Sequence, residues 1–185
     1  MISPDTGPEL EPERTEWAGK FITARTRGKW EYVTRARGIR AAVILAIDAE
    51  DHVLLVEQFR VPLGKICLEL PAGLIGDDDA SADEDPAAAA GRELEEETGY
   101  RAQRLDIVGE FYSSPGMVSE SFTLVRASGL TRVGPGGGTD SEDITVRRVA
   151  RRELPQFVQS ARARGLGIDV RLLMLLAPSI LGEMT

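Results

Sequence analysis

The 185-residue sequence has few of the residues on which several protein classes depend. Cys67 is the only cysteine, so no disulfide can form within the chain, and a reducing compartment, the cytoplasm, is the expected location. His52 is the only histidine, and its place at the edge of a turn argues against a catalytic triad or a zinc site. No apolar run reaches about 18 residues. The first residues also lack the pattern of a signal peptide, so we expect no membrane span.

Positive charge is scarce relative to negative charge. The chain has 22 Lys and Arg residues against 30 Asp and Glu residues, which gives a formal net charge of -8. This charge repels polyanions, so no nucleic acid partner is expected. With 42% hydrophobic and 28% charged residues, the composition is that of one ordinary folded domain with a sizeable core.

The rest of the chain is best understood from a helix predicted over residues 86–98. Asp85 is a good N-cap, Pro86 suits the first helical position, and Gly99 is a natural stop. One side of this helix is small and apolar and should face the core; its residues are Ala87, Ala90 and Leu94.

Glu93, Glu96 and Glu97 lie beside that apolar side. At about 100° per residue, the three carboxylates fall within a sector of roughly 100°. Carboxylates this close repel one another unless a cation lies between them, and hard oxygen ligands suit Mg²⁺ or Mn²⁺. A metal site is therefore one interpretation. A solvated acidic helix is the other, because charged runs usually face water.

The residues around these glutamates resemble a known signature. Glu84, then seven residues, then RELEEETGY over residues 92–100 is similar to the signature of the Nudix hydrolases, which cleave nucleoside diphosphates linked to another moiety. One departure precedes Glu84. The family has a glycine followed by five residues, whereas ten follow Gly73 and seven follow Gly76. The segment 74–83 therefore carries an insertion, and we interpret its aspartates as a solvated loop.

The resemblance implies an α/β fold, the Nudix α/β/α sandwich with a mixed β-sheet, preceded by an N-terminal β-hairpin region. We expect a flexible tail over residues 1–16, a strand pair over 17–37 and the Nudix domain over 38–185. Two more helices are predicted over 152–162 and 168–177, the second strongly apolar and ended or kinked by Pro178. Apolar, β-branched segments predict strands at 20–26, 30–34, 41–47, 52–58, 105–111, 121–126 and 144–149.

Other segments resemble the ADP-ribose branch of the family. EQFR over residues 57–60 is similar to a motif whose arginine contacts the substrate, so Arg60 is expected to bind a diphosphate through bidentate hydrogen bonds. Arg35 and Arg37 are weaker candidates for this task. The SPG turn that contains Pro115 resembles the marker of ADP-ribose and related sugar-nucleotide hydrolases.

Trp30 and Tyr32 share one face of a predicted strand. They either pack in a core or an interface, or they help to hold a nucleobase against an aromatic ring. The second role is implied by the resemblance, because ADP-ribose-cleaving Nudix enzymes use an N-terminal strand pair for substrate contact and for a swapped homodimer.

The loop 134–143 is rich in glycine, is expected to be mobile and ends in three acids. It is not a P-loop, because Gly-Lys followed by Ser or Thr is absent from it. Enzymes of the ADP-ribose branch take a catalytic glutamate from this region. Glu142 is therefore the first candidate for the group that activates water, and Asp140 is the second. A plain hairpin tip is the alternative.

The resemblance as a whole implies Mg²⁺-dependent hydrolysis of ADP-ribose or a related nucleoside diphosphate sugar to a nucleoside monophosphate and a sugar phosphate. The implied metal ligands are the three helix glutamates and the backbone carbonyl of Ala72, and Glu96 also counts among the catalytic residues. Arg92 is expected to pair with Glu84. The alternatives are a GDP-mannose hydrolase, a non-catalytic nucleotide sensor and a calcium-binding module.

Overall fold

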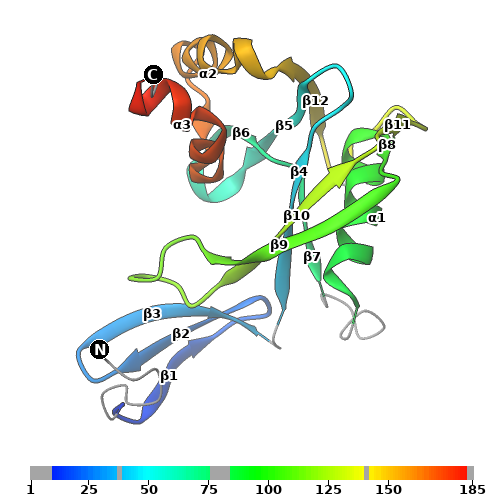
Figure 1. Cartoon of the computed structure of the whole chain (residues 1–185). Coiled ribbons are helices and arrows are strands. Elements are labelled where there is room, and N and C mark those ends of the chain that lie inside the picture. Colours follow the sequence, from blue (N-terminus) through cyan, green and yellow to red (C-terminus); the bar gives the residue numbers. More distant parts are fainter. Residues whose placement is uncertain (1–9, 37–38, 76–83, 140–141, 183–185) are drawn as a thin grey trace, which may run out of the picture.

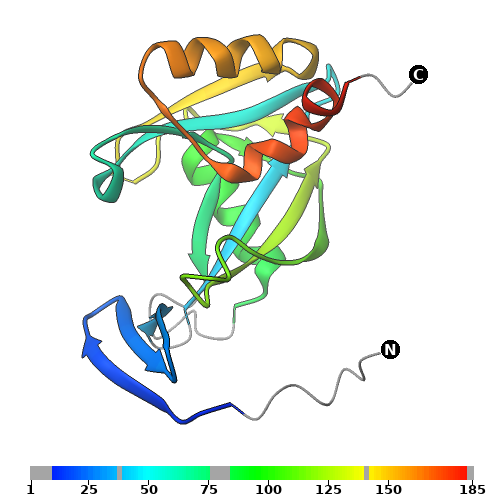
Figure 2. The same cartoon turned by 90° about the vertical axis from the view of Figure 1, so that its left-hand side faces the viewer.

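The computed structural model describes residues 10–36, 39–75, 84–139 and 142–182. A small N-terminal sheet lies beside a larger body of sheets and helices (Figures 1 and 2). This small sheet has three strands rather than the expected pair, in the order β1-β2-β3. Its first strand begins inside the predicted tail, because the backbone from Glu13 onward pairs with β2. The strands are β1 (Glu13–Ala18), β2 (Ile22–Arg27) and β3 (Trp30–Arg35).

The body contains two four-stranded sheets of mixed strand direction. In the first, ordered β7-β4-β10-β9, only the pair of β10 and β4 is parallel. In the second, ordered β12-β5-β6-β13, only β13 and β6 are parallel. The strands of the first sheet are β4 (Arg40–Ala46), β7 (Ala72–Ile75), β9 (Arg104–Tyr112) and β10 (Ser121–Ser128). Those of the second are β5 (His52–Arg60), β6 (Lys65–Glu69), β12 (Ile144–Ala150) and β13 (Gly167–Ile168).

Helices cover both faces of these sheets. α1 (Pro86–Thr98) lies on one side, and α2 (Leu154–Ala163) and α3 (Leu173–Leu181) lie on the other (Figure 1). Along β4, Ile44 packs in the core cluster that contains α1, while its neighbour Val43 packs in the cluster that contains α2 and α3. This alternation is what a strand buried on both faces requires. The predicted α/β/α sandwich with a mixed sheet is confirmed.

The local signals of the first helix are realised. Asp85 accepts a hydrogen bond from the Ala88 N–H at 3.2 Å, and Gly99 closes the helix in the left-handed region with φ 75°. The buried side differs slightly from the prediction, because Ala87 is only half-buried. The buried residues of α1 are Ala89, Ala90, Leu94, Glu97 and Thr98.

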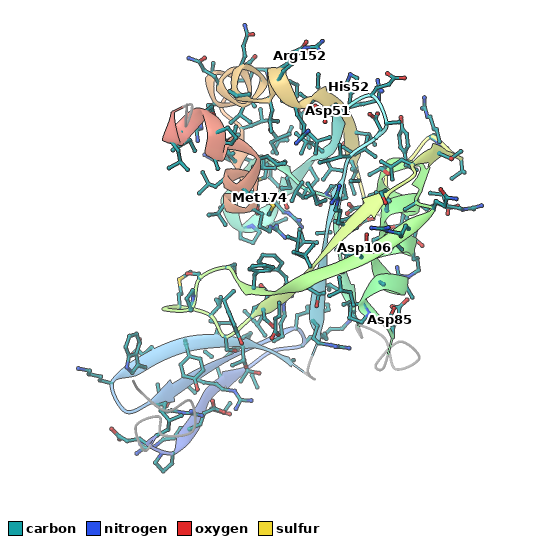
Figure 3. All side chains as sticks on the ribbon, in the orientation of Figure 1. Asp51, His52, Asp85, Asp106, Arg152 and Met174 are labelled. Carbon is teal, nitrogen blue, oxygen red and sulfur yellow. The ribbon has the colours of Figure 1, made fainter. Side chains whose placement is uncertain are left out.

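The C-terminal part departs further from the prediction. The expected helix over residues 168–177 starts later, because Ile168 pairs with β6 and Asp169 caps the 3₁₀-helix η4 (Val170–Leu172). Pro178 then lies inside α3 and does not end it. Met174 lies on this helix and is partly exposed, whereas His52 is the first residue of β5, directly after a turn (Figure 3).

The short elements of the body are β8 (Tyr100–Arg101), β11 (Thr131–Arg132), η2 (Val61–Leu63) and η3 (Arg151–Glu153). None of the helices in the described parts of the chain has the length and apolar character that crossing a membrane requires.

Candidate active site

A cleft of about 750 Å³ opens between α1 and the segment that leads into α3. Its wall is built from strands of both sheets, from α1, and from the loops that precede β10, β12 and α3. It therefore forms only when segments far apart in the sequence come together. The predicted site residues that line it are Arg35, Arg60, Ala72, Glu93, Glu96, Glu97 and Glu142.

Glu97 lies deepest among the α1 acids, with 3% of its surface exposed. Its Oε2 accepts a hydrogen bond from the Ala72 N–H at 3.1 Å, which ties α1 to β7. Burial and, to a lesser extent, the nearby carboxylates of Glu93 and Glu142 raise the pKa of Glu97 to about 8, against the lowering effect of that hydrogen bond. This carboxylate therefore lacks a sufficient counter-charge.

Arg92 holds the outer acids of α1. It donates hydrogen bonds to Glu93 at 2.7 Å and to Glu96 at 3.5 Å, and it pairs with Glu84 at 3.4 Å as the sequence predicted. Glu93 is half-buried, and burial raises its pKa although Arg92 opposes this. The close packing also explains Gly73, because a Cβ at this position would overlap the carboxylate of Glu93.

The carboxylates of the cleft suit a hard divalent cation in their chemistry. Oxygen donors from α1 face the same cleft, and the raised pKa of Glu97 marks a site where added positive charge would be stabilising. Within the described residues, however, no three acidic, histidine or cysteine side chains converge closely enough to enclose a metal ion. Arg92 occupies Glu93 and Glu96 instead, so a cation would have to displace these contacts.

Backbone hydrogen bonds join the described part of the glycine-rich loop, residues 134–139, to α1. The N–H of Gly137 donates to the Glu97 carbonyl at 2.8 Å, and that of Gly138 donates to the Glu96 carbonyl at 3.1 Å. Glu142 follows, and its Oε2 accepts hydrogen bonds from the N–H and the hydroxyl of Thr139 at 3.0 and 3.2 Å. These bonds satisfy carbonyls at the end of α1, and nothing in the sequence indicated them.

Arg60 lines the cleft but already has a partner. Its Nε and Nη2 donate to the two carboxylate oxygens of Glu69, each at 2.7 Å. Arg35 also lines the cleft and pairs with Glu120 at 2.5 Å. Both arginines thus keep part of their hydrogen-bonding capacity for a ligand, because one guanidinium has five N–H groups.

Three predicted substrate residues lie elsewhere. Trp30, Tyr32 and Pro115 line a separate hollow of about 370 Å³ between the N-terminal sheet and the loop before β10. Beside this hollow, the Val33 N–H donates to the Met117 carbonyl at 3.0 Å, which joins β3 to the loop before β10. Arg37 and Asp140 fall outside the described residues, as do the aspartates of the insertion.

Sequence reasoning missed Glu69 and Arg171, which both line the cleft. Glu69 is the only charge in the apolar segment ICLEL over residues 66–70, and Arg171 is the only charge in VRLLMLLA over residues 170–177. A charge within an apolar run is a recognisable signal, because burying it requires a partner. The sequence does not show which partner that is.

Comparison with known proteins agrees with this geometry. The NUDIX domain model matches residues 37–128. An uncharacterized Nudix hydrolase of Schizosaccharomyces pombe is 32% identical over 181 residues, which cover 88% of this chain and 85% of that protein. This chain belongs to the Nudix hydrolase family. Nudix hydrolases generally use divalent cations.

Two further similarities concern this Nudix chain. The ADP-ribose pyrophosphatase of Bacillus subtilis is 40% identical over 91 residues, which cover 49% of this chain and 46% of that enzyme. For several curated relatives, the matching region spans less than two thirds of their own length. The crystal structure of an ADP compounds hydrolase superposes with a TM-score of 0.67 over 96% of each chain at 23% identity, which establishes the common fold.

Proposed function

We propose that this Nudix chain hydrolyses the diphosphate linkage of ADP-ribose or a related nucleoside diphosphate sugar. The products would be a nucleoside monophosphate and a sugar phosphate. The observation that carries the proposal is one cleft that holds the α1 carboxylates, Glu142 and Arg60 together. The similarity to an ADP-ribose pyrophosphatase supports the substrate class.

Glu93, Glu96, Glu97 and the carbonyl of Ala72 would hold one or more Mg²⁺ or Mn²⁺ ions. A bound cation supplies charge neutralisation at the diphosphate and lowers the pKa of a water molecule. Arg92 would then keep its pairing with Glu84 and release Glu93 and Glu96. Arg60 would bind a phosphate with the N–H groups that Glu69 does not use.

Glu142 is the residue that we assign to proton transfer. Thr139 engages its Oε2, so we assign Oε1 to the attacking water. The water oxygen bonds to one phosphorus of the diphosphate while the bond from that phosphorus to the bridging oxygen breaks. The water proton passes to Glu142, and the bridging oxygen leaves with the other phosphate. Such general-base assistance contributes about 10² to 10⁴ in rate. Asp140 remains the second candidate.

We also propose a homodimer in which the N-terminal sheet contacts the nucleobase. Within one chain, Trp30 and Tyr32 line a different space from the cleft, which fits a contact with a base bound in the cleft of a second copy. Large apolar side chains exposed on this sheet support an interface; they are Trp17, Phe21, Ile22 and Trp30. Light scattering should give a molar mass twice that of one chain. Phe21→Lys should lower this molar mass toward that of a single chain.

Hydrolysis is tested directly by incubating the purified chain with Mg²⁺ and a panel that includes ADP-ribose and GDP-mannose. Released phosphomonoester is measured after a phosphatase step. Glu97→Gln should lower turnover by orders of magnitude while circular dichroism stays unchanged. Glu95→Gln is the matched control, because Glu95 is on the same helix but pairs with Arg101 away from the cleft. Full turnover by Glu97→Gln would refute the assignment.

A further inference from the structure

We propose that Arg171, held by Asp169, positions Arg60 for the substrate's diphosphate by sharing the carboxylate of Glu69. Arg171 is thus a positioning residue from the C-terminal segment, far in sequence from the Nudix signature. The inference rests on the proposed function, because it takes Arg60 as a phosphate-binding group.

Glu69 is the centre of this group. Its side chain is almost fully buried at the end of β6, and both of its oxygens are engaged. Arg60 binds them in a bidentate manner at 2.7 Å, and Nη2 of Arg171 lies 3.4 Å from Oε2. A buried carboxylate needs such partners, so its orientation depends on both guanidinium groups.

Arg171 is itself fixed from two sides. Asp169 accepts two hydrogen bonds from the Arg171 guanidinium, from Nε at 2.6 Å and from Nη2 at 2.7 Å, and a third from the Arg171 backbone N–H at 2.8 Å. Its guanidinium carbon lies 5.7 Å from the ring centre of Phe122, which is within the range of a cation–π contact. Asp169 is anchored in turn, because its N–H donates to the carbonyl of Leu68 at 3.0 Å. The chain Asp169–Arg171–Glu69–Arg60 is therefore supported on β6.

Arg60 and Arg171 differ in exposure, and this difference suits Arg60 to bind the phosphate and Arg171 to position Arg60. The side chain of Arg60 is 40% exposed in the cleft, whereas that of Arg171 is 17% exposed. Arg60 has N–H groups left for an incoming phosphate, and a guanidinium that is already oriented loses less conformational freedom on binding. Arg171 keeps Glu69, and through it Arg60, in that orientation.

The test compares Arg171→Met with a matched control, Arg164→Met. Arg164 also pairs with a buried carboxylate, Glu57 of β5, at 2.8 Å, but neither residue lines the cleft. The readouts are kcat and KM for ADP-ribose with Mg²⁺, and the inhibition constant of adenosine 5′-(α,β-methylene)diphosphate. For Arg171→Met we expect KM and the inhibition constant to rise about tenfold with kcat nearly unchanged. Arg164→Met should leave all three unchanged.

A double-mutant cycle shows whether Arg171 acts through Arg60. In an Arg60→Met background, adding Arg171→Met should change neither KM nor the inhibition constant further. Asp169→Asn should also raise KM and the inhibition constant. This variant provides the test if Arg171→Met fails to fold. Independent effects in the cycle, an unchanged KM, or a KM lowered by Asp169→Asn would overturn the inference. If the wild-type chain turns over no substrate, the proposed function fails instead.

Discussion

Glu97 should make the metal-free protein less stable as the pH rises. Its carboxylate is buried and accepts one hydrogen bond, from the Ala72 N–H. Burial first, and then the neighbouring charges of Glu93 and Glu142, raise its pKa from 4.5 to about 8. The folded chain therefore resists ionisation of Glu97, whereas the unfolded chain does not.

The direction of this pH dependence follows from the number of protons that the folded and unfolded chains bind. Between pH 4.5 and about 8 the folded chain keeps the proton of Glu97 while the unfolded chain has lost it. Because the folded state binds more protons in this window, the free energy of unfolding falls as the pH rises through it. At about 1.4 kcal/mol per pKa unit, the loss reaches at most on the order of 4 kcal/mol by pH 8.

Urea unfolding of chelator-treated protein, followed by circular dichroism, measures this effect. Wild type and Glu97→Gln should have similar stability at pH 5, and the variant should be more stable at pH 8 by up to about 4 kcal/mol. Added Mg²⁺ should restore the wild type and leave the variant unchanged. Glu95→Gln should show no such gain, because the hydrogen bond from Arg101 lowers the pKa of Glu95.

A stability difference between wild type and Glu97→Gln that is the same at both pH values would refute the reasoning. So would equal stabilisation of the two proteins by Mg²⁺. Either result would mean that Glu97 is not an under-compensated buried carboxylate in the folded chain.

Two substitutions and one labelling experiment also test the cleft. Glu142→Gln should lower kcat by about 10² to 10⁴ with little change in KM, measured by steady-state kinetics; an unaltered kcat would point to another base. Gly73→Ala should weaken Mn²⁺ binding in calorimetry, because the added Cβ would displace the carboxylate of Glu93, and unchanged affinity would count against Glu93 as a ligand. Cys67 should react slowly with iodoacetamide at neutral pH, as followed by mass spectrometry, because burial raises the pKa of its thiol to about 12; rapid labelling of the folded chain would contradict this burial.

Local signals made the first helix and the family predictable. The N-cap Asp85, Pro86 and the left-handed Gly99 act within one or two turns, so they operate in any tertiary setting. The spacing of Glu93, Glu96 and Glu97 follows from helix geometry alone. The Nudix family and the sandwich fold were predicted from the resemblance of residues 84–100 to the family's signature, and both are confirmed.

The sequence did not reveal the contacts between segments that lie far apart in the chain. The pairing of Arg60 with Glu69 depends on the hairpin of β5 and β6, and the role of Arg171 depends on β13 lying beside β6. The glycine loop looked free because its stabilising bonds go to carbonyls of α1, which side-chain patterns do not reveal.

The sequence by itself determined which residues could bind a cation and a diphosphate, because charge and helical spacing are local properties. Only the tertiary structure decided which of them share a space. It placed Glu142 beside α1 and separated Trp30 and Tyr32 from the cleft of their own chain. Burial and long-range pairing set these outcomes, and both depend on how the segments pack together.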